Sequence, residues 1–164
     1  AQRTMEQRQI FVNNLSIRRA CEELKRSDDY QQIARILVAA FNSNDFEALE
    51  LRLRDTGQLP RHLHGMQFTL PLGDETRFTW RKPGTVLGMD IVSCWSLALD
   101  LTSTNNRRHG ALVLYRLYNG HDLQLDINLL ASQFAVALAD AFERAMIEHP
   151  ESEASHVEQV FAAV

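Results

Sequence analysis

Two histidines, His62 and His64, have the type and spacing that come closest to a metal-binding motif. Residues at i and i+2 of an extended segment lie on the same side of the chain, so both imidazoles would point one way, as some metal sites require. However, no acidic or cysteine ligand lies close by in the sequence. We therefore interpret them as solvated loop histidines, expect no metal site, and keep both as candidates for contact with a small-molecule ligand.

The two cysteines, Cys21 and Cys94, lie far apart in the sequence, and neither belongs to a CxxC pair. This spacing does not support a disulfide framework or a zinc ribbon, and it favours a reducing cytosolic setting. Cys94 lies inside an apolar strand pattern, where a cysteine is more often a small buried hydrophobic residue than a reactive thiol. The pattern therefore indicates a packing role for Cys94.

One turn sequence, residues 72–76 (Leu-Gly-Asp-Glu-Thr), echoes the GGDEF signature of diguanylate cyclases. That signature needs its first glycine so that the backbone can approach the nucleotide, and Leu72 occupies this position. A plain hairpin turn is the better interpretation. The sequence contains no GxSxG, P-loop or GxGxxG motif, and no pair of carboxylates suited to acid–base catalysis. We therefore predict no catalytic residues in this chain.

The composition is that of an ordinary soluble globular domain, with 164 residues, 45% of them hydrophobic and 23% charged, enough for one sizeable core. The net charge of −4 and the pI near 5.9 leave no excess of positive charge to neutralise phosphates, so nucleic-acid binding is not expected. Arg107-Arg108-His109 is a small basic cluster that we interpret as a solvated hairpin tip. No apolar run is long enough to cross a bilayer, and the chain begins inside a helical pattern, which favours a piece of a longer protein.

The N-terminal segment, residues 2–25, has the pattern of a helix with a narrow apolar stripe. Ile10, Ile17 and Leu24 are spaced seven apart, and Asn13 and Ala20 fall between them, which makes a short heptad seam. Such a helix needs a second helix beside it. One interpretation is that the stripe packs on its own domain, and the other is that it pairs with a partner subunit or continues a signalling helix.

Elements of both types follow along the chain. A helix with N-cap candidates at 27–29 is predicted to run through Phe41. Alternating apolar and polar residues predict strands at 47–54, 66–70, 76–80 and 93–101. Pro71 begins a turn and marks the strand before it as an edge strand. The run from Gly110 to Tyr118 is mostly aliphatic and aromatic, which predicts a central strand, with both faces at least partly covered.

The last predicted helix, residues 126–146, is the most apolar element of the sequence. At 100° per residue its apolar side chains span roughly 200° of arc, which is wider than a single buried stripe needs. We therefore expect an element other than the sheet to cover part of this helix.

The order of these elements resembles that of a GAF domain. The most specific local match is Gly110-Ala111-Leu112-Val113-Leu114-Tyr115, followed by residues 123–126 and the helix through 134–138. This is similar to the GAF ending, in which a final strand precedes a helix that packs under the sheet. The chain lacks the conventional chromophore cysteine in the later loop and the Asn-Lys-Phe-Asp-Glu run of cyclic-nucleotide binders, so the resemblance implies neither of those ligands.

A narrower resemblance involves residues 16–24 (Ser-Ile-Arg-Arg-Ala-Cys-Glu-Glu-Leu), residues 49–53, and the closing strand and helix. These segments are similar to the cytosolic C-terminal extension of some bacterial membrane transferases, the undecaprenyl-phosphate N-acetylglucosaminyl phosphate transferases, which move an N-acetylhexosamine phosphate from a UDP-sugar to undecaprenyl phosphate. The resemblance implies a cytoplasmic domain that is tethered to the inner membrane by segments outside this chain. It implies that the transferase chemistry belongs to those segments too.

These patterns predict an α+β fold (α/β three-layer, GAF/PAS-like). We expect an antiparallel sheet of five or six strands, with the N- and C-terminal helices on one face and the loops around His62 and Gly84 on the other. The expected organisation is a connecting or dimerisation helix at 1–26, a GAF-like domain at 27–149 and a C-terminal tail at 150–164.

The function implied by the resemblance is a non-catalytic sensory or regulatory module, in which the sheet and the loops 55–65 and 82–90 enclose a small-molecule pocket. Fold analogy contributes most of the candidate lining residues, which are Phe78, Trp80, Trp95, Cys94, His62 and His64. The alternative is a structural assembly domain with a filled core and no ligand. The sequence identifies neither a ligand nor a cofactor.

A homodimer is the expected assembly. The N-terminal seam would contribute Ile10, Ile17 and Leu24, and the last helix would contribute Leu129 and Val136, which are seven apart on its otherwise polar side. Two copies would bring four such helices into a bundle. The alternative is that both stripes bury against each other within one chain and leave a monomer. Contact with a membrane is expected only through the rest of a parent chain.

Overall fold

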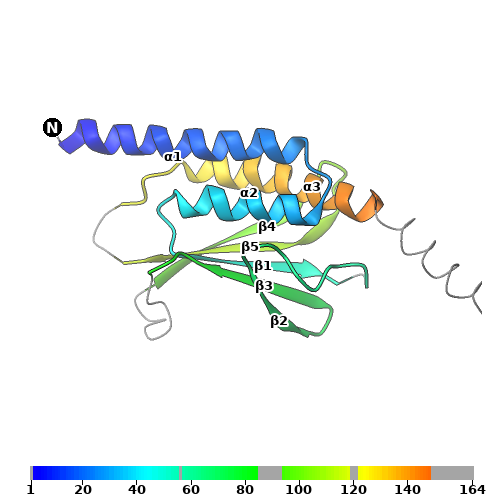
Figure 1. The fold of residues 1–164 in the computed structure, drawn as a ribbon. Coiled ribbons are helices and arrows are strands. Elements are labelled where there is room, and N and C mark those ends of the chain that lie inside the picture. Colours follow the sequence, from blue (N-terminus) through cyan, green and yellow to red (C-terminus); the bar gives the residue numbers. More distant parts are fainter. Residues whose placement is uncertain (1, 56, 85–93, 119–121, 149–164) are drawn as a thin grey trace, which may run out of the picture.

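The computed structural model describes residues 2–55, 57–84, 94–118 and 122–148. The elements are α1 (Gln2–Lys25), α2 (Tyr30–Asn42), β1 (Ala48–Arg54), β2 (Gln67–Leu72), β3 (Glu75–Arg81), β4 (Cys94–Thr102), β5 (Arg108–Leu117), η2 (Leu129–Phe134) and α3 (Ala135–Glu148). They form an α+β fold with a five-stranded antiparallel sheet and the terminal helices on one face, which confirms the predicted fold class (Figure 1). No helix in this described part of the chain is long and apolar enough to cross a membrane.

The sheet has the strand order β2-β3-β1-β5-β4, and every neighbouring pair is antiparallel. The prediction that the Gly110 to Tyr118 run forms a central strand is confirmed, because β5 lies inside the sheet next to β1. Both β1 and β5 have a strand on each side, which is why the β5 sequence has the apolar character of an inner strand. The edge position of β2 is confirmed, but β2 continues through Pro71 to Leu72, so the turn is shorter than predicted.

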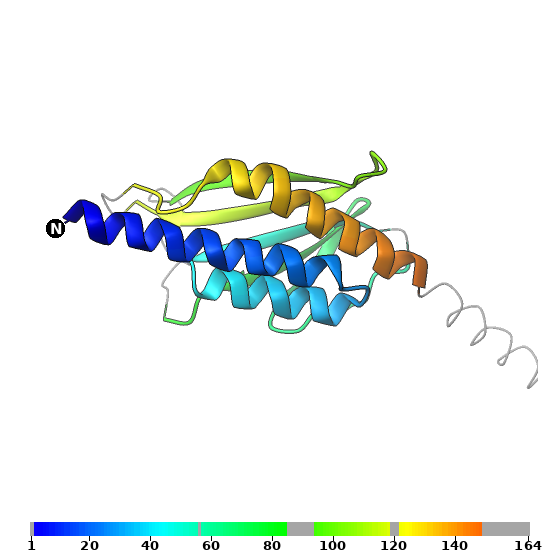
Figure 2. The same cartoon turned by 90° about the horizontal axis from the view of Figure 1, so that it is seen from above.

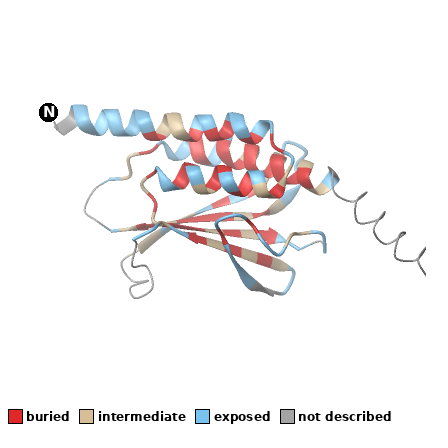
Figure 3. Ribbon diagram, in the orientation of Figure 1, coloured by how far each residue is buried: buried red, intermediate tan, exposed pale blue. Residues whose placement is uncertain are grey.

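The helices form two layers on the same face of the sheet. Figures 1 and 2 show α2 and α3 next to the sheet, with α1 lying across both of them. Most residues of α2 and α3 are buried or half-buried, whereas the outer side of α1 is exposed (Figure 3). The prediction that another element covers the last helix is confirmed, because α1 packs on both η2 and α3.

The heptad seam of α1 packs within its own chain. Ile17 and Leu24 have no exposed surface, and the Asn13 side-chain amide donates a hydrogen bond to the Gln124 carbonyl oxygen at 2.7 Å. Only Ile10, 36% exposed, lies outside the core. The seam residues Ile17 and Leu24 are therefore unavailable to a partner, because α2 and α3 already bury them. Dimerisation itself stays a prediction, and it would have to involve residues other than Ile17 and Leu24.

The last helix is not α-helical throughout. Residues 129–134 form the π-helix η2, which leads directly into α3. A π-turn holds more residues than an α-turn, so it changes the direction in which the following side chains point. Leu129, which an unbroken 3.6-residue period places on the polar side, is buried beside Leu130, whereas Ile127 is exposed. The predicted partner residue Leu129 thus belongs to the core, and Val136 is half-buried in a groove between α1 and α3.

The loop after β1 lies against the helices, which corrects the prediction that it covers the opposite face of the sheet. The Gln31 side chain of α2 donates to the His62 carbonyl oxygen at 2.6 Å and accepts from the His64 backbone N–H at 2.8 Å. Leu63, between the two histidines, is buried in the core. Its burial on the helix side explains the position of the loop. The second predicted loop lies mostly in 85–93, outside the described residues, and the predicted tail 150–164 lies outside them as well.

Candidate functional site

The aromatic residues predicted to line a pocket lie on the core side of the sheet. Phe78 and Trp80 of β3 are buried in the main hydrophobic cluster. Trp95 of β4 packs edge-on against Phe46, with 6.2 Å between the ring centroids. Because β1 and β5 separate β3 from β4, and adjacent strands are about 4.8 Å apart, the two groups are roughly 14 Å apart. These side chains fill the core and do not converge on one pocket.

The remaining predicted site residues lie elsewhere. Cys94 directly precedes Trp95 in β4, so its side chain points to the opposite face of the sheet. His62 and His64 are exposed on the loop that contacts α2. Within the residues that the structure describes, no group of three or more His, Cys, Asp or Glu side chains could hold a metal ion. The structure therefore does not bring the predicted residues into a common site.

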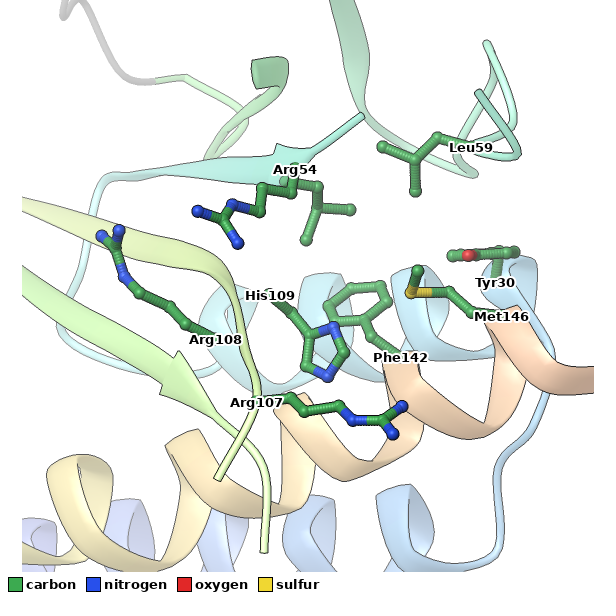
Figure 4. A pocket seen from close by; sticks show the side chains of 9 residues that line it. Tyr30, Arg54, Leu59, Arg107, Arg108, His109, Phe142 and Met146 are labelled. Atoms are coloured by element: carbon green, nitrogen blue, oxygen red, sulfur yellow. The ribbon is translucent and has the colours of Figure 1, made fainter. Parts of the chain in front are cut away.

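A cleft of about 320 Å³ opens at a different place, between the end of β1, the β4–β5 turn, the start of α2 and the end of α3 (Figure 4). We call it the arginine cleft, and it is lined by Tyr30, Leu53, Arg54, Leu59, Arg107, Arg108, His109, Phe142 and Met146. The volume is at the lower end of the range of about 300–1,000 Å³ found for small-molecule sites. The sequence predictions named none of these residues as ligand-binding.

The floor of the arginine cleft is apolar. Tyr30 and Phe142 are buried, with their ring centroids 6.1 Å apart, and the half-buried Leu59 and Met146 lie beside them (Figure 4). Burial raises the pKa of Tyr30 to about 12, so its hydroxyl stays protonated and uncharged at neutral pH. The floor therefore presents hydrocarbon, aromatic and thioether groups to a ligand without adding a negative charge.

The rim of the cleft is basic. Arg54, Arg107 and Arg108 are all exposed, and His109 lies between the arginines and the floor (Figure 4). Arg108 Nη2 is 3.3 Å from an Asp100 carboxylate oxygen, but both side chains are largely exposed, so this ion pair is weak. The rim thus keeps positive charge available to a ligand.

Beneath the rim, Glu143 of α3 is a buried carboxylate with several partners. It accepts a hydrogen bond from Asn105 Nδ2 at 3.0 Å, and its other oxygen, Oε1, lies 3.7 Å from Arg107 Nε and 3.6 Å from His109 Nε2. Neither Glu143 Oε1 nor His109 Nε2 has a hydrogen-bond partner within the described part of the chain. The solvated hairpin tip predicted from Arg107-Arg108-His109 is thus correct for the exposed arginines and wrong for His109, because the imidazole turns inward to Glu143.

Comparison of the chain with protein-family models, with curated proteins and with solved structures gives no match. Function is therefore inferred from the chemistry of the chain's own sites.

A larger groove of about 490 Å³ runs between α1 and α3, and two of its charged side chains, Arg144 and Asp140, hold neighbouring segments together. Arg144 donates to the backbone oxygens of Ser27 and Leu24, at 3.1 and 2.6 Å. Asp140 accepts hydrogen bonds from both the backbone N–H and the hydroxyl of Thr104. These contacts join α3 to α1 and to the β4–β5 turn, so we assign the groove a structural role.

A charged network occupies the sheet face that lies away from the helices. Glu50 of β1 lies 2.7 Å from Arg52 Nε and 3.6 Å from Arg77 Nε, and the Tyr115 hydroxyl donates to it at 3.2 Å. The hydrogen bond that Arg52 donates to Glu50 raises the pKa of the Arg52 guanidinium, and burial together with the Glu50 charge raises the pKa of Tyr115. Because Glu50 pairs with groups of β3, β1 and β5, the network joins the three strands.

Sequence reasoning missed the arginine cleft because its residues come from α2, β1, β5, α3 and two connecting segments, which lie far apart in the sequence. The one local signal was the Arg107-Arg108-His109 cluster in a chain of net negative charge. Leu59 and Met146 carried no signal of their own, since an isolated apolar residue in a loop or at a helix end is common.

Proposed function

We propose that this chain is a non-catalytic regulatory module that binds a small molecule in the arginine cleft. The composition of the cleft carries the proposal: several elements bring an apolar floor under a rim of three arginines and one histidine. Pockets of this kind, mostly apolar with a few convergent polar groups, are the usual form of small-molecule sites. The α+β architecture with its antiparallel sheet agrees with the sensory type of domain that the GAF resemblance implies.

The position of the cleft supports a regulatory role. A ligand there would contact the loop after β1 through Leu59, the β4–β5 turn through Arg107 and Arg108, and the end of α3 through Met146. In turn, α3 packs on α1. If these segments have two arrangements, a ligand that binds one of them more tightly increases the population of that arrangement, and with it the corresponding positions of α3 and α1. The difference between the two affinities sets the size of the shift.

A thermal-unfolding screen against nucleotides, UDP-sugars and hydrophobic metabolites tests whether a ligand exists. A ligand at a hundred times its Kd stabilises the folded chain by about 2.7 kcal/mol, which raises the Tm by roughly 5 °C or more. We expect a shift that the Leu59→Asp variant loses and that Arg8→Met, on the exposed side of α1, retains. Persistent absence of any shift, or a shift that Leu59→Asp leaves intact, would count against the proposal.

The transferase resemblance extends the proposal to a setting. In that setting the module regulates a membrane-associated enzyme that transfers a sugar phosphate to a polyprenyl phosphate, and it contributes no catalytic group. Introducing Leu59→Asp into such a parent chain should abolish the effect of the ligand on turnover and preserve basal turnover. Equal loss of basal turnover in Leu59→Asp and Arg8→Met would instead indicate that the module acts only in assembly.

A second candidate function, a structural assembly domain without a ligand, is favoured by different residues. The predicted pocket residues Phe78 and Trp80 fill the core, and α1 exposes Met5, Phe11 and Val12 by 71%, 64% and 54%. Sedimentation equilibrium of the wild type and of Phe11→Glu, with Gln9→Glu as the control on the same exposed part of α1, tests this candidate. Assembly that only Phe11→Glu disrupts supports it, and a monomeric wild type at tens of micromolar protein excludes it.

A further inference from the structure

The arginine cleft concentrates positive charge in a chain whose formal net charge is −4. Three of its lining side chains are arginines, which come from the end of β1, the β4–β5 turn and the start of β5. Arg54 makes no ion pair within the described residues, although Glu75 lies opposite it in the β1–β3 register. An uncommitted guanidinium at the rim is a site for an anion.

The other two arginines are held only loosely. Arg107 Nε is 3.7 Å from Glu143, and the Arg107 side chain is 72% exposed. Arg108 and its partner Asp100 are both mostly exposed, so water and salt screen their attraction. A guanidinium presents paired N–H donors that match the oxygens of a carboxylate or a phosphate. Arg108 can therefore exchange a weak surface contact for a paired contact with a ligand oxyanion.

His109 adds an independent observation that points to a ligand. Its side chain is 11% exposed, and its Nε2 has no hydrogen-bond partner within the described residues, although Glu143 Oε1 lies 3.6 Å away. A polar atom buried to this extent normally has a partner. A ligand oxygen in the cleft, donated to by Nε2–H, would supply that partner.

The apolar floor favours a ligand whose remaining part is apolar. Leu59 and Met146 are half-buried, and the neighbouring floor residues Tyr30 and Phe142 are buried and uncharged (Figure 4). An inorganic ion would leave this surface in contact with water, whereas a hydrocarbon body would cover it. The cleft thus offers binding free energy to a molecule that is charged at one end and apolar at the other.

We propose that the arginine cleft binds an organic anion, with a carboxylate or phosphate at Arg54, Arg108 and His109 and an apolar body on Leu59 and Met146. This proposal rests on the proposed function and names the ligand class of the same site.

The head group is tested with probes that share one alkyl chain: octanoate, octyl phosphate, octanol and octylammonium, with inorganic phosphate as the probe without a chain. Calorimetric titration of the full chain below the micellar range should give at least one octyl anion an affinity about tenfold higher than that of octanol. Added salt should lower the affinity of the chain for the octyl anion and leave its affinity for octanol unchanged. Octanoate and octyl phosphate, compared with each other, distinguish the carboxylate from the phosphate.

The site is tested with substitutions at exposed positions, where folding is little affected. Arg54→Met with Arg108→Met should lower the affinity of the octyl anion about tenfold and leave octanol unchanged. Arg8→Met, an exposed arginine on α1, is the matched control and should change neither affinity. Met146→Gln should lower the affinities for both octanol and the octyl anion, because it places a polar group in the apolar floor.

The outcomes separate the two proposals. Octanol binding as tightly as the octyl anions, or anion binding that survives the double arginine substitution, overturns the assignment of an anion and leaves a ligand-binding cleft in place. Inorganic phosphate binding as tightly as octyl phosphate overturns the assignment of an apolar body. If neither these probes nor any compound of the thermal screen binds, the proposed function itself is overturned.

Discussion

Gly110 of β5 lies so close to Arg52 of β1 that a Cβ on the glycine would be 1.9 Å from the Arg52 carbonyl oxygen. The backbone of Gly110 also has φ +145°, a conformation that L side chains rarely adopt. The register of β4 against β5 shifts at this end of the strands, and the next residue toward the turn is His109, whose side chain turns inward to Glu143. The glycine thus permits both the close strand pairing and the inward imidazole.

We expect Gly110→Ala to destabilise the chain by at least about 3 kcal/mol, because the clash is with backbone and the strand pair must separate to relieve it. Urea denaturation followed by circular dichroism measures the change. Gly73→Ala is the matched control: Gly73 also has positive φ, +70°, but nothing lies within 4 Å of the added carbon. Gly73→Ala should lower the free energy of unfolding by only about 1 kcal/mol. Equal losses in the two variants would show that backbone strain dominates over the close approach.

A second prediction concerns Arg116, whose side chain is 4% exposed and lies 2.8 Å from the Asp45 carboxylate. The guanidinium also donates to the Asp122 carbonyl oxygen at 3.1 Å, and it lies 6.0 Å from the Trp95 ring centroid. Asp45→Asn leaves this buried charge without its counter-ion, so we expect a loss of about 3 kcal/mol in the free energy of unfolding.

The exposed pair Lys25 and Glu22 is the control for Asp45→Asn, since both side chains are 63% exposed. Glu22→Gln should change the free energy of unfolding by less than about 1 kcal/mol. A loss in Asp45→Asn as small as that in Glu22→Gln would mean that water compensates Arg116 once its partner is gone.

Alkaline pH should destabilise the fold through Tyr30. Burial raises the pKa of Tyr30 to about 12 from 10.0, so between these values the unfolded chain releases the phenol proton first. The contribution of Tyr30 to the free energy of unfolding is fully present below pH 10.0 and is lost as the pH rises towards 12. The loss is at most about 3 kcal/mol. Unfolding curves of the wild type and Tyr30→Phe across this window measure it. Parallel pH dependences in the two proteins would contradict the prediction.

The two cysteines should differ in reactivity. Burial raises the pKa of the Cys21 thiol, which keeps it protonated at neutral pH, and Cys21 is 4% exposed. Cys94 is half-buried at the start of an edge strand. With a thiol reagent at mildly alkaline pH, we expect Cys94 to react first and Cys21 to react only as fast as the chain opens. The Cys94→Ser variant isolates Cys21, and rapid labelling of that variant would show that α1 separates readily from the other helices.

Local patterns predicted the elements whose structure depends on neighbours in the sequence. Asp29 caps α2 by accepting from the Gln32 backbone N–H, and Leu51 of β1 alternates inward, as expected. The π-helix η2 was not predictable, since it follows from tertiary packing and the helical wheel assumed a constant period. The strand order depends on contacts between distant segments of the chain, so local patterns do not determine it.

The site was less predictable than the fold. Aromatic residues of strands, such as Phe78 and Trp80, pack in cores as readily as they line pockets, and the sequence does not distinguish the two. Arg54 and His109 meet only because β1 and β5 pair antiparallel, and Met146 reaches them only because α3 crosses that end of the sheet. Such convergence from several elements leaves no local pattern in the sequence.

As the outermost layer, α1 should open more readily than the helices and strands beneath it. Because α1 packs on α2 and α3, it can separate from them while the sheet keeps its own pairing. Amide hydrogens near Phe11, in the exposed half of α1, should exchange with solvent within seconds to minutes. Those around Leu138, in the helix enclosed between α1 and the sheet, should wait for global unfolding, so exchange lifetimes would lengthen from the outer helix inward.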